Sequence, residues 1–599
     1  MTMPKLASLA SILLVFASCS GATGRGGGNT GTGGDEETGG GGGGSTPTGG
    51  KEGGTGGKAV TGGSNGGGTG GVVGGDGGSG GGGGGTGGGA GGTGGKGGSG
   101  GTGGAVGGSG GTPTGGAGGS PPPSGLVVAT NRYDNGRSGW NSKETALNAT
   151  NVGSPSFGLL FSKPVMGKVY NMPLFVGGVT VKGAKKNVVY VTTEHNMVYA
   201  FDNDDGNAAP LWTRMLEAPL PLPISGGFPS CQDLTASGEV GVTSTPAIDV
   251  ATNKMYLVSK TNGTHKLHAI DLGTGDDVQG SPVDIKGMGF DSNRHLNRPG
   301  LLLQDGTIYI GFGSHCDDDP YHGWMFAYDA AGLTQTGMYN VTPNGTNKPR
   351  GAIWQSGMGL AGDDKGVYFC TGNGLFDGAN AALSVLRLNP KTLSMGDRFT
   401  PSNAGDLNGS DQDLTAGVVF LGNTGLMVSG GKGGDMYLMP RNNLKAQKTI
   451  PMDATPQYHP ELHNFAYMEN ASGQLVYVWP DGGVLTAYKL AAGNLTKQAQ
   501  NTIHPSGYNG GHPGGIITLS SNGTMPGTAV AWTTVSTGGD AWHKTATGDF
   551  IAFDASMVSK APLFREAVGN LAKFSPPMVA NGKVWVATFS GKVNVYGLK

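Results

Sequence analysis

One short pattern recurs eight times along residues 126–599, and it limits the possible folds more than any other feature of the chain. Each copy has a β-rich run of the type Val-Tyr-Val, a turn-rich loop, and a second run that often ends in Asp. The third positions of the first runs lie 50 to 66 residues apart, which is longer than a hairpin and suits a four-stranded sheet with its connections. These positions are Tyr190, Tyr256, Tyr309, Tyr368, Met427, Tyr477, Ala531 and Trp585.

A further apolar run precedes most copies, for example at Pro173, Pro246, Pro299, Gly515 and Pro577, and we interpret it as the first strand of each unit. The pattern predicts an all-β fold, an eight-bladed β-propeller with four-stranded antiparallel blades. The last copy reaches the C-terminus without an outer strand. We therefore expect residues 157–165 (FGLLFSKPV) to supply that strand and to close the ring. The alternative is a pair of β-sandwiches, which does not explain eight spaced copies.

A glycine-rich segment of very different composition precedes the repeats. Of the 122 glycines in the chain, 58 lie within residues 21–120, and large apolar side chains are almost absent there. Such a segment cannot bury enough surface to offset the entropy of ordering its backbone. We predict that residues 20–125 form a disordered, flexible tether and that residues 126–599 form the propeller.

The first residues have the pattern of an export signal. Lys5 precedes an apolar run at residues 9–17, and Phe-Ala-Ser then leads to Cys19. The apolar run is too short for a permanent membrane span, and no later run of about 18 apolar residues follows. Residues 16–19 resemble the lipobox of bacterial lipoproteins, which implies a signal peptide at residues 1–19, lipidation of Cys19, and an address at the outer membrane or cell surface. The alternative is ordinary secretory cleavage that leaves Cys19 free.

Several segments resemble the quinoprotein dehydrogenase-like propellers built from pyrroloquinoline-quinone-type repeats. The similar segments begin at Asn131, Asn187, Arg298 and Ile353, so the likeness covers about residues 131–599. The resemblance implies an eight-bladed propeller. Many members of this superfamily are implied to be assembly factors, whereas others are dehydrogenases that use pyrroloquinoline quinone and Ca²⁺.

Quinone dehydrogenases surround Ca²⁺ with an Asn and carboxylates, use an Asp as base, and place a basic side chain on the quinone. By this resemblance, the catalytic candidates are Asp377, Glu194 and Arg298, and the cofactor-binding candidates are Asn373, Lys432 and Trp354. Other interpretations stay open, because Asn373 precedes Gly in a turn motif and Trp354 is also suited to packing near the channel.

The loop at residues 314–322 (SHCDDDPYH) concentrates oxygen and nitrogen ligands, and Asp317, Asp318 and Asp319 are candidates for holding Ca²⁺. Solvated turn carboxylates are the alternative. The segment HPELH at residues 459–463 spaces two histidines four apart but lacks the HExxH order of a zinc helix. Propeller loops converge at one end of the channel. They bring further candidates there, among them His463, His512, Asp481 and Trp542.

An exported protein can form disulfides, and Cys231 and Cys316 lie in connections expected on the same face. We therefore predict a disulfide between them and expect Cys370, at the end of a strand, to be a small buried residue.

Formal net charge is −2, which argues against a protein that binds nucleic acid by neutralising phosphates. The chain has no adjacent cysteine pair and no GxSxG, Walker or dinucleotide motif. The leading hypothesis is therefore a membrane-tethered binding or scaffold propeller whose loop face holds an envelope protein or a small molecule. The second hypothesis is a dehydrogenase dependent on Ca²⁺ and pyrroloquinoline quinone, and the third is a hydrolase or lyase.

Overall fold

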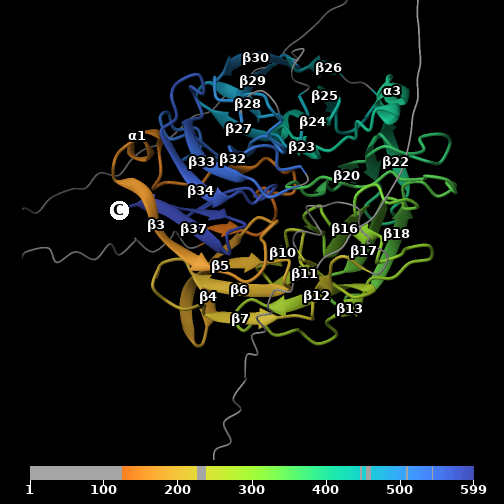
Figure 1. The fold of residues 1–599 in the computed structure, drawn as a ribbon, viewed down its shortest axis with the longest axis horizontal. Helices are drawn as coiled ribbons and strands as arrows, with labels where there is room; N and C mark the ends of the chain where they lie inside the picture. Colours follow the sequence, from red (N-terminus) through yellow and green to blue (C-terminus); the bar gives the residue numbers. More distant parts are fainter. Residues whose placement is uncertain (1–124, 225–237, 446–447, 454–459, 507–509, 543) are drawn as a thin grey trace, which may run out of the picture. The chain divides into compact units, whose positions relative to one another are not determined.

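Eight antiparallel sheets follow one another around a ring (Figure 1). The structure is a computed structural model that describes residues 125–224, 238–445, 448–453, 460–506, 510–542 and 544–599. The proposed signal peptide and tether, with Cys19, lie outside the described residues, and so does Cys231. No helix in the described ranges is long and apolar enough to cross a membrane. The predicted eight-bladed β-propeller with mostly four-stranded blades is confirmed.

The blades follow the order of the chain, and most use four consecutive strands. Blade 1 contains β4 (Leu174–Val181), β5 (Ala184–Thr192), β6 (Met197–Asp202) and β7 (Trp212–Met215), with β1 (Val127–Val128) beside β4. Blade 2 contains β10 (Ala247–Asp249), β11 (Lys254–Thr261), β12 (Thr264–Asp271) and β13 (Val283–Asp284). Blade 3 contains β15 (Leu302–Gln304), β16 (Thr307–Ser314), β17 (Trp324–Asp329) and β18 (Gln335–Asn340), with β14 (His295–Leu296) also on β16. Blade 4 contains β19 (Ala361–Asp363), β20 (Gly366–Cys370), β21 (Val385–Leu388) and β22 (Met395–Phe399).

The second half of the ring repeats this arrangement. Blade 5 contains β23 (Val418–Phe420), β24 (Leu426–Gly430), β25 (Asp435–Pro440) and β26 (Lys448–Pro451). Blade 6 contains β27 (Ala466–Asn470), β28 (Gly473–Val478), β29 (Thr486–Ala491) and β30 (Asn494–Gln500). Blade 7 contains β31 (Ile516–Ser520), β32 (Val530–Ser536), β33 (Thr547–Asp554) and β34 (Phe564–Asn570), with β2 (Trp140–Asn141) parallel to β31. Outside the blades lie α1 (Ala149–Val152), α3 (Ala404–Gly409), the 3₁₀ turn Gly422–Thr424, and the pair β8 (Leu220–Pro221) and β9 (Glu239–Val240).

Blade 8 joins the two ends of the described chain. It contains β35 (Met578–Ala580), β36 (Lys583–Ala587) and β37 (Lys592–Leu598), and its outer strand is β3 (Phe157–Pro164). Antiparallel pairing of β3 with β37 runs from Phe157 opposite Leu598 to Pro164 opposite Lys592. The predicted closing strand is therefore confirmed, and the pairing covers the sheet edge that β37 would otherwise expose.

Local turn chemistry sets the register of the inner strands. Asp305 and Gly306 join β15 to β16 with φ of 48° and 73°, and Asn581 and Gly582 join β35 to β36 with φ of 52° and 73°. Two consecutive positive φ angles are typical of a type I′ turn, whose twist matches that of the flanking strands. Asp-Gly and Asn-Gly are favoured there because glycine adopts these angles without a Cβ penalty.

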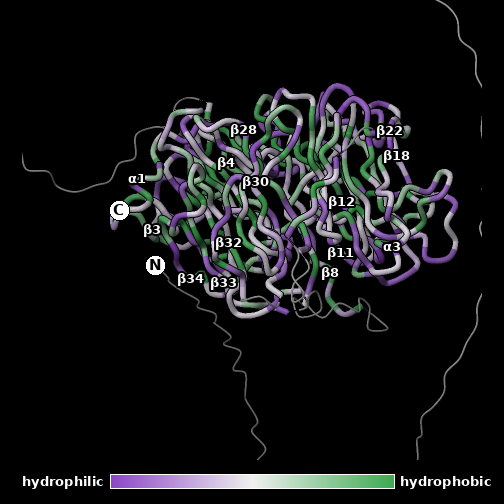
Figure 2. The backbone as a smooth tube through the Cα atoms, turned by 90° about the horizontal axis from the view of Figure 1, so that it is seen from above, coloured by the Kyte–Doolittle hydropathy of each residue, from purple (hydrophilic) through white to green (hydrophobic). Residues whose placement is uncertain are grey.

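The hydrophobic core is a closed series of clusters between blades. Blades 8, 1 and 2 share one cluster, and a separate cluster lies at each further interface from blade 2 to blade 8. Trp585 of blade 8, for instance, is fully buried in the cluster that also holds Val189 of blade 1. Figure 2 shows the apolar strands inside the ring and hydrophilic turns at its two faces. The ring is thus held together by packing at every interface as well as by the closing strand.

The repeated tyrosine of the second strand links neighbouring blades. Tyr256 donates to the carbonyl of Ala330 at 2.9 Å, and Tyr477 donates to the carbonyl of Ala555 at 2.7 Å. Each acceptor directly follows the third strand of the next blade. The same bond is made by Tyr190 to Leu272, Tyr309 to Pro390 and Tyr368 to Arg441, and Trp585 donates to the side chain of Asn203 in blade 1. The recurring residue that reveals the repeat is therefore an interblade hydrogen-bond donor.

Replacing Tyr477 by phenylalanine is expected to lower the free energy of unfolding by about 1 to 2 kcal/mol, because the buried carbonyl of Ala555 would lose its donor. Guanidinium unfolding followed by tryptophan fluorescence measures the change. Tyr339→Phe is the matched control, since the Tyr339 hydroxyl contacts the Met395 sulfur at 3.9 Å and this pair is exposed. Equal midpoints for the two variants would contradict an energetic role for the interblade bond.

The first residues of the described chain, ahead of α1 and β3, run along the inner strands of the ring. Figure 1 shows α1 and β3 themselves at its outer edge. Residues 127–141, here called the plug segment, bond to the first strand of every blade. Five of its backbone carbonyls each accept from a backbone N–H in a different blade. The pairs are Ala129 with Ile248 in blade 2, Asn135 with Gly362 in blade 4, Gly136 with Phe420 in blade 5, Ser138 with Tyr467 in blade 6, and Gly139 with Leu519 in blade 7. The side chains of Asn135 and Asn141 donate to Leu303 and Val579, in blades 3 and 8, and β1 pairs with β4 in blade 1. The plug segment therefore provides partners for the inner sheet edges.

Two arginines of the plug segment are completely buried. Arg137 donates from Nε to the carbonyl of Leu360 at 2.7 Å and from Nη2 to that of Leu301 at 3.0 Å. Arg132 donates from Nη2 to the carbonyl of Phe465 at 2.6 Å. Burial lowers the pKa of Arg137 to about 9 and that of Arg132 to about 10. The direct partners of both guanidinium groups are backbone carbonyls, together with the Thr130 hydroxyl for Arg137, and none is a carboxylate among the described residues.

Candidate functional site

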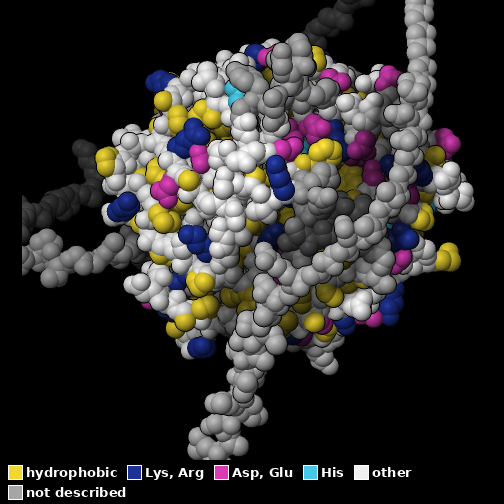
Figure 3. All heavy atoms as spheres, in the orientation of Figure 1, with side chains coloured by type: hydrophobic (Ala, Val, Ile, Leu, Met, Phe, Trp, Pro, Cys, Tyr) yellow, Lys and Arg dark blue, Asp and Glu magenta, His cyan; other side chains and the backbone are white. Residues whose placement is uncertain are grey.

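A cavity of about 250 Å³ lies where the loops of blades 3 to 8 converge. The face drawn in Figure 3 is hollowed near its middle, with acidic side chains gathered along one edge of the hollow. Charged, aromatic and imidazole groups all contribute to the cavity wall. Its lining residues are Arg298, Cys316, Asp317, Trp354, Ser356, Asp411, Asp413, Thr415, Lys432, His463, His512, Trp542, Lys573 and Phe574.

Most of the lining comes from the connection that precedes the first strand of a blade. Arg298 precedes β15, Trp354 precedes β19, Asp413 precedes β23, His463 precedes β27 and His512 precedes β31. Each of these residues lies three to seven positions ahead of the strand that starts the blade. Because these strands surround the channel, one position per blade delivers side chains that are far apart in sequence to a single cavity.

One side of the cavity carries a lysine held by two carboxylates. Lys432 Nζ lies 2.8 Å from Asp413 Oδ2 and 3.3 Å from Asp411 Oδ2. Burial alone lowers the pKa of Lys432, but the Asp413 and Asp411 carboxylates outweigh it and raise the pKa above its usual value. Burial also raises the pKa of Asp411 to about 6, and the nearby Asp413 charge adds to the rise. The charges of this group are therefore largely balanced within the protein.

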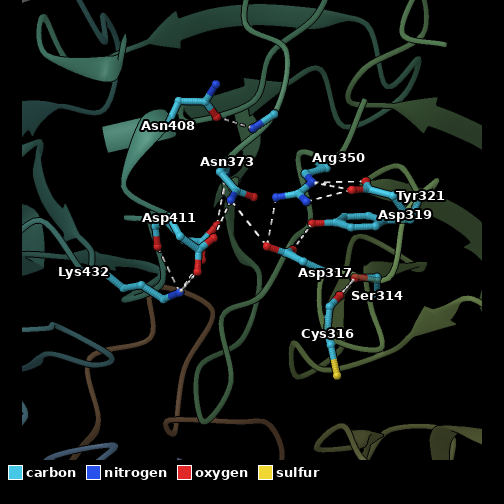
Figure 4. Close-up of polar contacts among 12 residues, drawn as sticks. Ser314, Cys316, Asp317, Asp319, Tyr321, Arg350, Asn373, Asn408, Asp411 and Lys432 are labelled. Carbon is cyan, nitrogen blue, oxygen red and sulfur yellow. Dashed lines mark hydrogen bonds and ion pairs between the residues drawn. The ribbon is translucent and has the colours of Figure 1, made fainter. Parts of the chain in front are cut away.

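A polar network continues from Asp411 to the loop of blade 3 (Figure 4). Asn373 Nδ2 donates to Asp411 Oδ1 at 2.5 Å and lies 3.5 Å from Asp317 Oδ2. Arg350 pairs with both Asp317, at 3.1 Å, and Asp319, at 2.7 Å. The Tyr321 hydroxyl also donates to Asp317. Asp317 and Asp319 of the loop at residues 314–322, here called the DDD loop, thus have protein partners. The buried Oδ1 of Asn373 has no hydrogen-bond partner among the described residues.

Aromatic side chains form another part of the wall. The guanidinium carbon of Arg298 lies 5.6 Å from the ring centroid of Trp354 and 5.4 Å from that of Phe574, so the cation is placed between two rings. The indole Nε1 of Trp354 is buried and has no hydrogen-bond partner in the described part of the chain. A buried donor without a partner is costly, which identifies this position as one that a ligand acceptor or a water would satisfy.

Two histidines and two carboxylates meet between blades 6 and 7. His463 Nε2 lies 3.8 Å from Glu461 Oε2 and 3.7 Å from Asp481 Oδ1, and His512 Nδ1 lies 3.1 Å from Asp481 Oδ2. Burial would lower the pKa of His463, but the Asp481 and Glu461 carboxylates outweigh it and raise the pKa to about 9. Burial lowers the pKa of His512 despite Asp481. These four residues, here called the His-carboxylate cluster, are the set of described residues whose ligand atoms are close enough to share a metal ion.

Residues selected from the sequence divide into three groups in the structure. Arg298, Trp354, Lys432 and Asp317 line the cavity, and Asn373 lies directly behind it through Asp411. Asp318, Asp319 and the exposed Asp377 do not line it. Glu194 is buried, with Oε2 accepting from the backbone N–H of Gly241 at 2.7 Å. The roles suggested for all these residues, including Ca²⁺ binding by the DDD loop, stay predictions.

Several lining residues were not selected from the sequence. They are Ser356, Asp411, Asp413, Thr415, Lys573 and Phe574. Asp413 and Phe574 occupy the same position ahead of β23 and β35 that Arg298 occupies ahead of β15. If the residues four or five positions ahead of every inner strand had been chosen, Asp413 and Phe574 would have been among the candidates. His459, which the sequence also suggested, lies outside the described residues.

One of the two described cysteines lies in the wall of the cavity. Cys316 lines it and is disulfide-bonded, whereas Cys370 is a free, buried thiol, as expected for a residue at a strand end. Because Cys231 falls outside the described residues, its pairing with Cys316 stays a prediction.

Comparison with known proteins places the chain by its fold. No protein-family model matches the sequence, and no curated protein sequence matches it. The structure is similar to quinohemoprotein alcohol dehydrogenase ADHIIG from Pseudomonas putida HK5, with a TM-score of 0.53 and 15% identity over 79% of this chain and 80% of the other. Quinohemoprotein alcohol dehydrogenase from Comamonas testosteroni gives 0.49 and 16% over 79% and 80%, and BamB from Moraxella catarrhalis gives 0.43 and 13% over 74% and 98%. At this identity the likeness shows the fold alone, which is that of an eight-bladed β-propeller.

Proposed function

We propose that this protein is a binding propeller whose cavity holds a compact polar ligand. The supporting observation is the unpartnered Nε1 of Trp354 in the wall of a cavity that six blades build. A volume of about 250 Å³ is below the roughly 300–1,000 Å³ of pockets that bury drug-sized ligands, so the ligand should be small. It should carry a hydrogen-bond acceptor for Trp354 and tolerate the aromatic surfaces of Trp354 and Phe574.

The proposed site of action is the cell envelope. The export signal, the lipobox-like Cys19 and the glycine-rich tether are the sequence features that support it. A tether of about 100 glycine-rich residues has a root-mean-square span of roughly 50–60 Å, which would hold a propeller away from a lipid surface. In this proposal the membrane is contacted through the lipid anchor, and the ligand or an envelope partner is contacted through the loop face.

A thermal-shift screen of the purified protein tests the binding function. The probes are hydroxycarboxylates, amino acids and monosaccharides at millimolar concentration, with EDTA present. We expect at least one probe to raise the Tm, by mass action on the folded state, and to bind about 3- to 10-fold more weakly to Trp354→Phe, which keeps the ring but removes the donor. Trp140→Phe is the matched control, because the Trp140 indole bonds Ser521 Oγ outside the cavity. No shift in the wild type, or equal affinity in Trp354→Phe, would contradict the proposal.

The alternative is a dehydrogenase that uses pyrroloquinoline quinone and Ca²⁺. The observation that favours it is the group of oxygens formed by Asn373, Asp411 and Asp317, in which Asn373 Oδ1 lacks a partner beside two carboxylates. Oxygen donors of this kind fit Ca²⁺, which would supply a Lewis acid next to the quinone. Repeating the screen without EDTA, with pyrroloquinoline quinone and Ca²⁺ added, separates the two functions, because a thermal shift accompanied by dye reduction with alcohols would favour the dehydrogenase.

A further inference from the structure

The His-carboxylate cluster has the chemistry of a transition-metal site. His463 and Glu461 precede β27, Asp481 follows β28 in the same blade, and His512 precedes β31 in the next blade. One ligand atom from each residue lies within 4.8 Å of the others. Imidazole nitrogens combined with carboxylate oxygens favour Zn²⁺ and its first-row neighbours over Ca²⁺ or Mg²⁺, which prefer oxygen alone.

Two of the three contacts in the cluster are too long for hydrogen bonds, whereas His512 Nδ1 and Asp481 Oδ2 bond each other at 3.1 Å. His463 Nε2 is 3.7 Å from Asp481 Oδ1 and 3.8 Å from Glu461 Oε2, and both distances exceed a hydrogen bond. Two atoms that each lie about 2.1 Å from a tetrahedral Zn²⁺ are about 3.4 Å apart. A shift of a few tenths of an ångström would therefore bring these atoms to ligand positions.

The inward-facing atoms of the cluster lack other partners. His463 Nε2 and Asp481 Oδ1 are both buried, and neither has a hydrogen-bond partner among the described residues. The His463 side chain is only 5% exposed. Buried polar atoms almost always have a hydrogen-bond partner or a metal ion beside them. Two neighbouring buried atoms without a partner therefore indicate that a further group binds between them. Two carboxylates in one buried cluster also favour a dication over a neutral molecule.

The surroundings hold the cluster in place. The backbone N–H of Asp481 donates to the carbonyl of Glu461 at 3.1 Å, which joins the two segments of blade 6. The Phe574 ring packs against both imidazoles, with centroids 5.7 Å from His463 and 5.3 Å from His512. Such support lowers the cost of arranging the ligands when an ion binds.

We infer that Glu461, His463, Asp481 and His512 bind one Zn²⁺ or a similar divalent transition-metal ion in the wall of the cavity. Because His463 and His512 also line the cavity, the ion would be within reach of a small ligand there. This site goes beyond the proposed ligand-binding function and does not depend on it. A proton shared by His463 and Asp481 is the competing explanation, which the experiment below separates.

The test uses the full chain without a histidine tag, freed of metal with EDTA and then desalted. Zn²⁺ alone is titrated by calorimetry, and Co²⁺ is titrated by visible absorption, which reports nitrogen and oxygen ligands in a defined geometry. We expect one equivalent of metal, a rise in Tm on Zn²⁺ addition, and a Co²⁺ spectrum. His463→Gln and Asp481→Asn should each weaken Zn²⁺ binding by at least about 10- to 100-fold, the loss seen even when an outer partner of a ligand is removed.

Two further variants keep the outcome decisive. Glu461→Gln changes the most exposed member of the cluster, so it should fold even if the buried variants do not, and it should also weaken binding. His322→Gln is the matched control, because His322 bonds Thr342 Oγ1 outside the cavity and should leave Zn²⁺ affinity unchanged. Absence of stoichiometric Zn²⁺ binding, or equal Zn²⁺ affinity in all four variants, would overturn the proposed metal site. The proton shared by His463 and Asp481 would then be the explanation of the cluster. The ligand screen contains EDTA, so either proposal can fail alone.

Discussion

Replacement of Arg137 by methionine is expected to lower the free energy of unfolding by at least about 3 kcal/mol. Its guanidinium is fully buried and donates to the carbonyls of Leu360, Leu301 and Asn131. Methionine fills a similar volume but donates nothing, so several buried carbonyls would lose their partner, at about 1 to 3 kcal/mol each. Guanidinium unfolding followed by tryptophan fluorescence measures the loss.

Arg565→Met is the matched control. Arg565 is half-exposed on β34 and pairs with Asp549 Oδ2 at 2.7 Å, and an exposed ion pair contributes at most about 1 kcal/mol. A buried charge also carries a desolvation cost that the methionine variant would remove. Unchanged or raised stability in Arg137→Met would mean that this cost exceeds the value of the carbonyl bonds, and it would contradict the role of the plug segment as a partner for the inner strands.

The plug segment is the part of the fold that the sequence did not predict. Residues 131–139 (NRYDNGRSG) are rich in turn formers and charge, which is typical of a surface loop. Arginine is almost never fully buried unless it is paired, so a pattern of local residues gives no reason to place Arg132 and Arg137 in a channel. Their partners are carbonyls of four different blades, and only the closed ring brings those carbonyls together.

The blades themselves were predictable because their signals are local. Tyr190, Tyr256 and Tyr477 recur at a fixed place in the second strand, and each makes the same bond to the next blade. That bond is a reason for the tyrosine to stand at this position in each unit. Residues 157–165 were identified as the closing strand by elimination, since blade 8 otherwise lacked an outer strand.

The cavity was predictable only in part. Arg298 and Trp354 were proposed from the family resemblance, and both line the cavity because they lie in connections that lead into inner strands. Asp377 was selected from a motif, but its loop leaves it exposed and outside the cavity wall. The His463–Asp481 contact depends on the distance between two connections of one blade, and the approach of His512 depends on the angle between two blades. Such distances are properties of the assembled ring and have no signature in residue spacing.

Glu194→Gln is expected to abolish a pH dependence of stability worth about 2 to 3 kcal/mol between pH 5 and pH 8. Glu194 is buried, and its burial raises its pKa to about 7, against an ordinary value near 4.3. Between those two values the folded protein binds more protons at this site than the unfolded chain does. The contribution of Glu194 to stability is therefore fully present below about pH 4.3 and is lost as the pH rises through about 7.

The glutamine variant keeps the shape of the side chain and an oxygen acceptor for the N–H of Gly241, which lies 2.7 Å from Oε2 of Glu194, and for the Thr243 hydroxyl at 3.2 Å. It cannot ionise, so its stability relative to the wild type should rise steadily from pH 5 to pH 8. Denaturant midpoints across this range measure the difference, and the same substitution at the half-buried Glu566 on β34 corrects for the change from carboxylate to amide. A constant difference between Glu194→Gln and the wild type would show that Glu194 is already ionised in the folded protein at pH 5. That result would require a solvated or cation-paired carboxylate, which would return Glu194 to the group of candidates for chemistry at the channel.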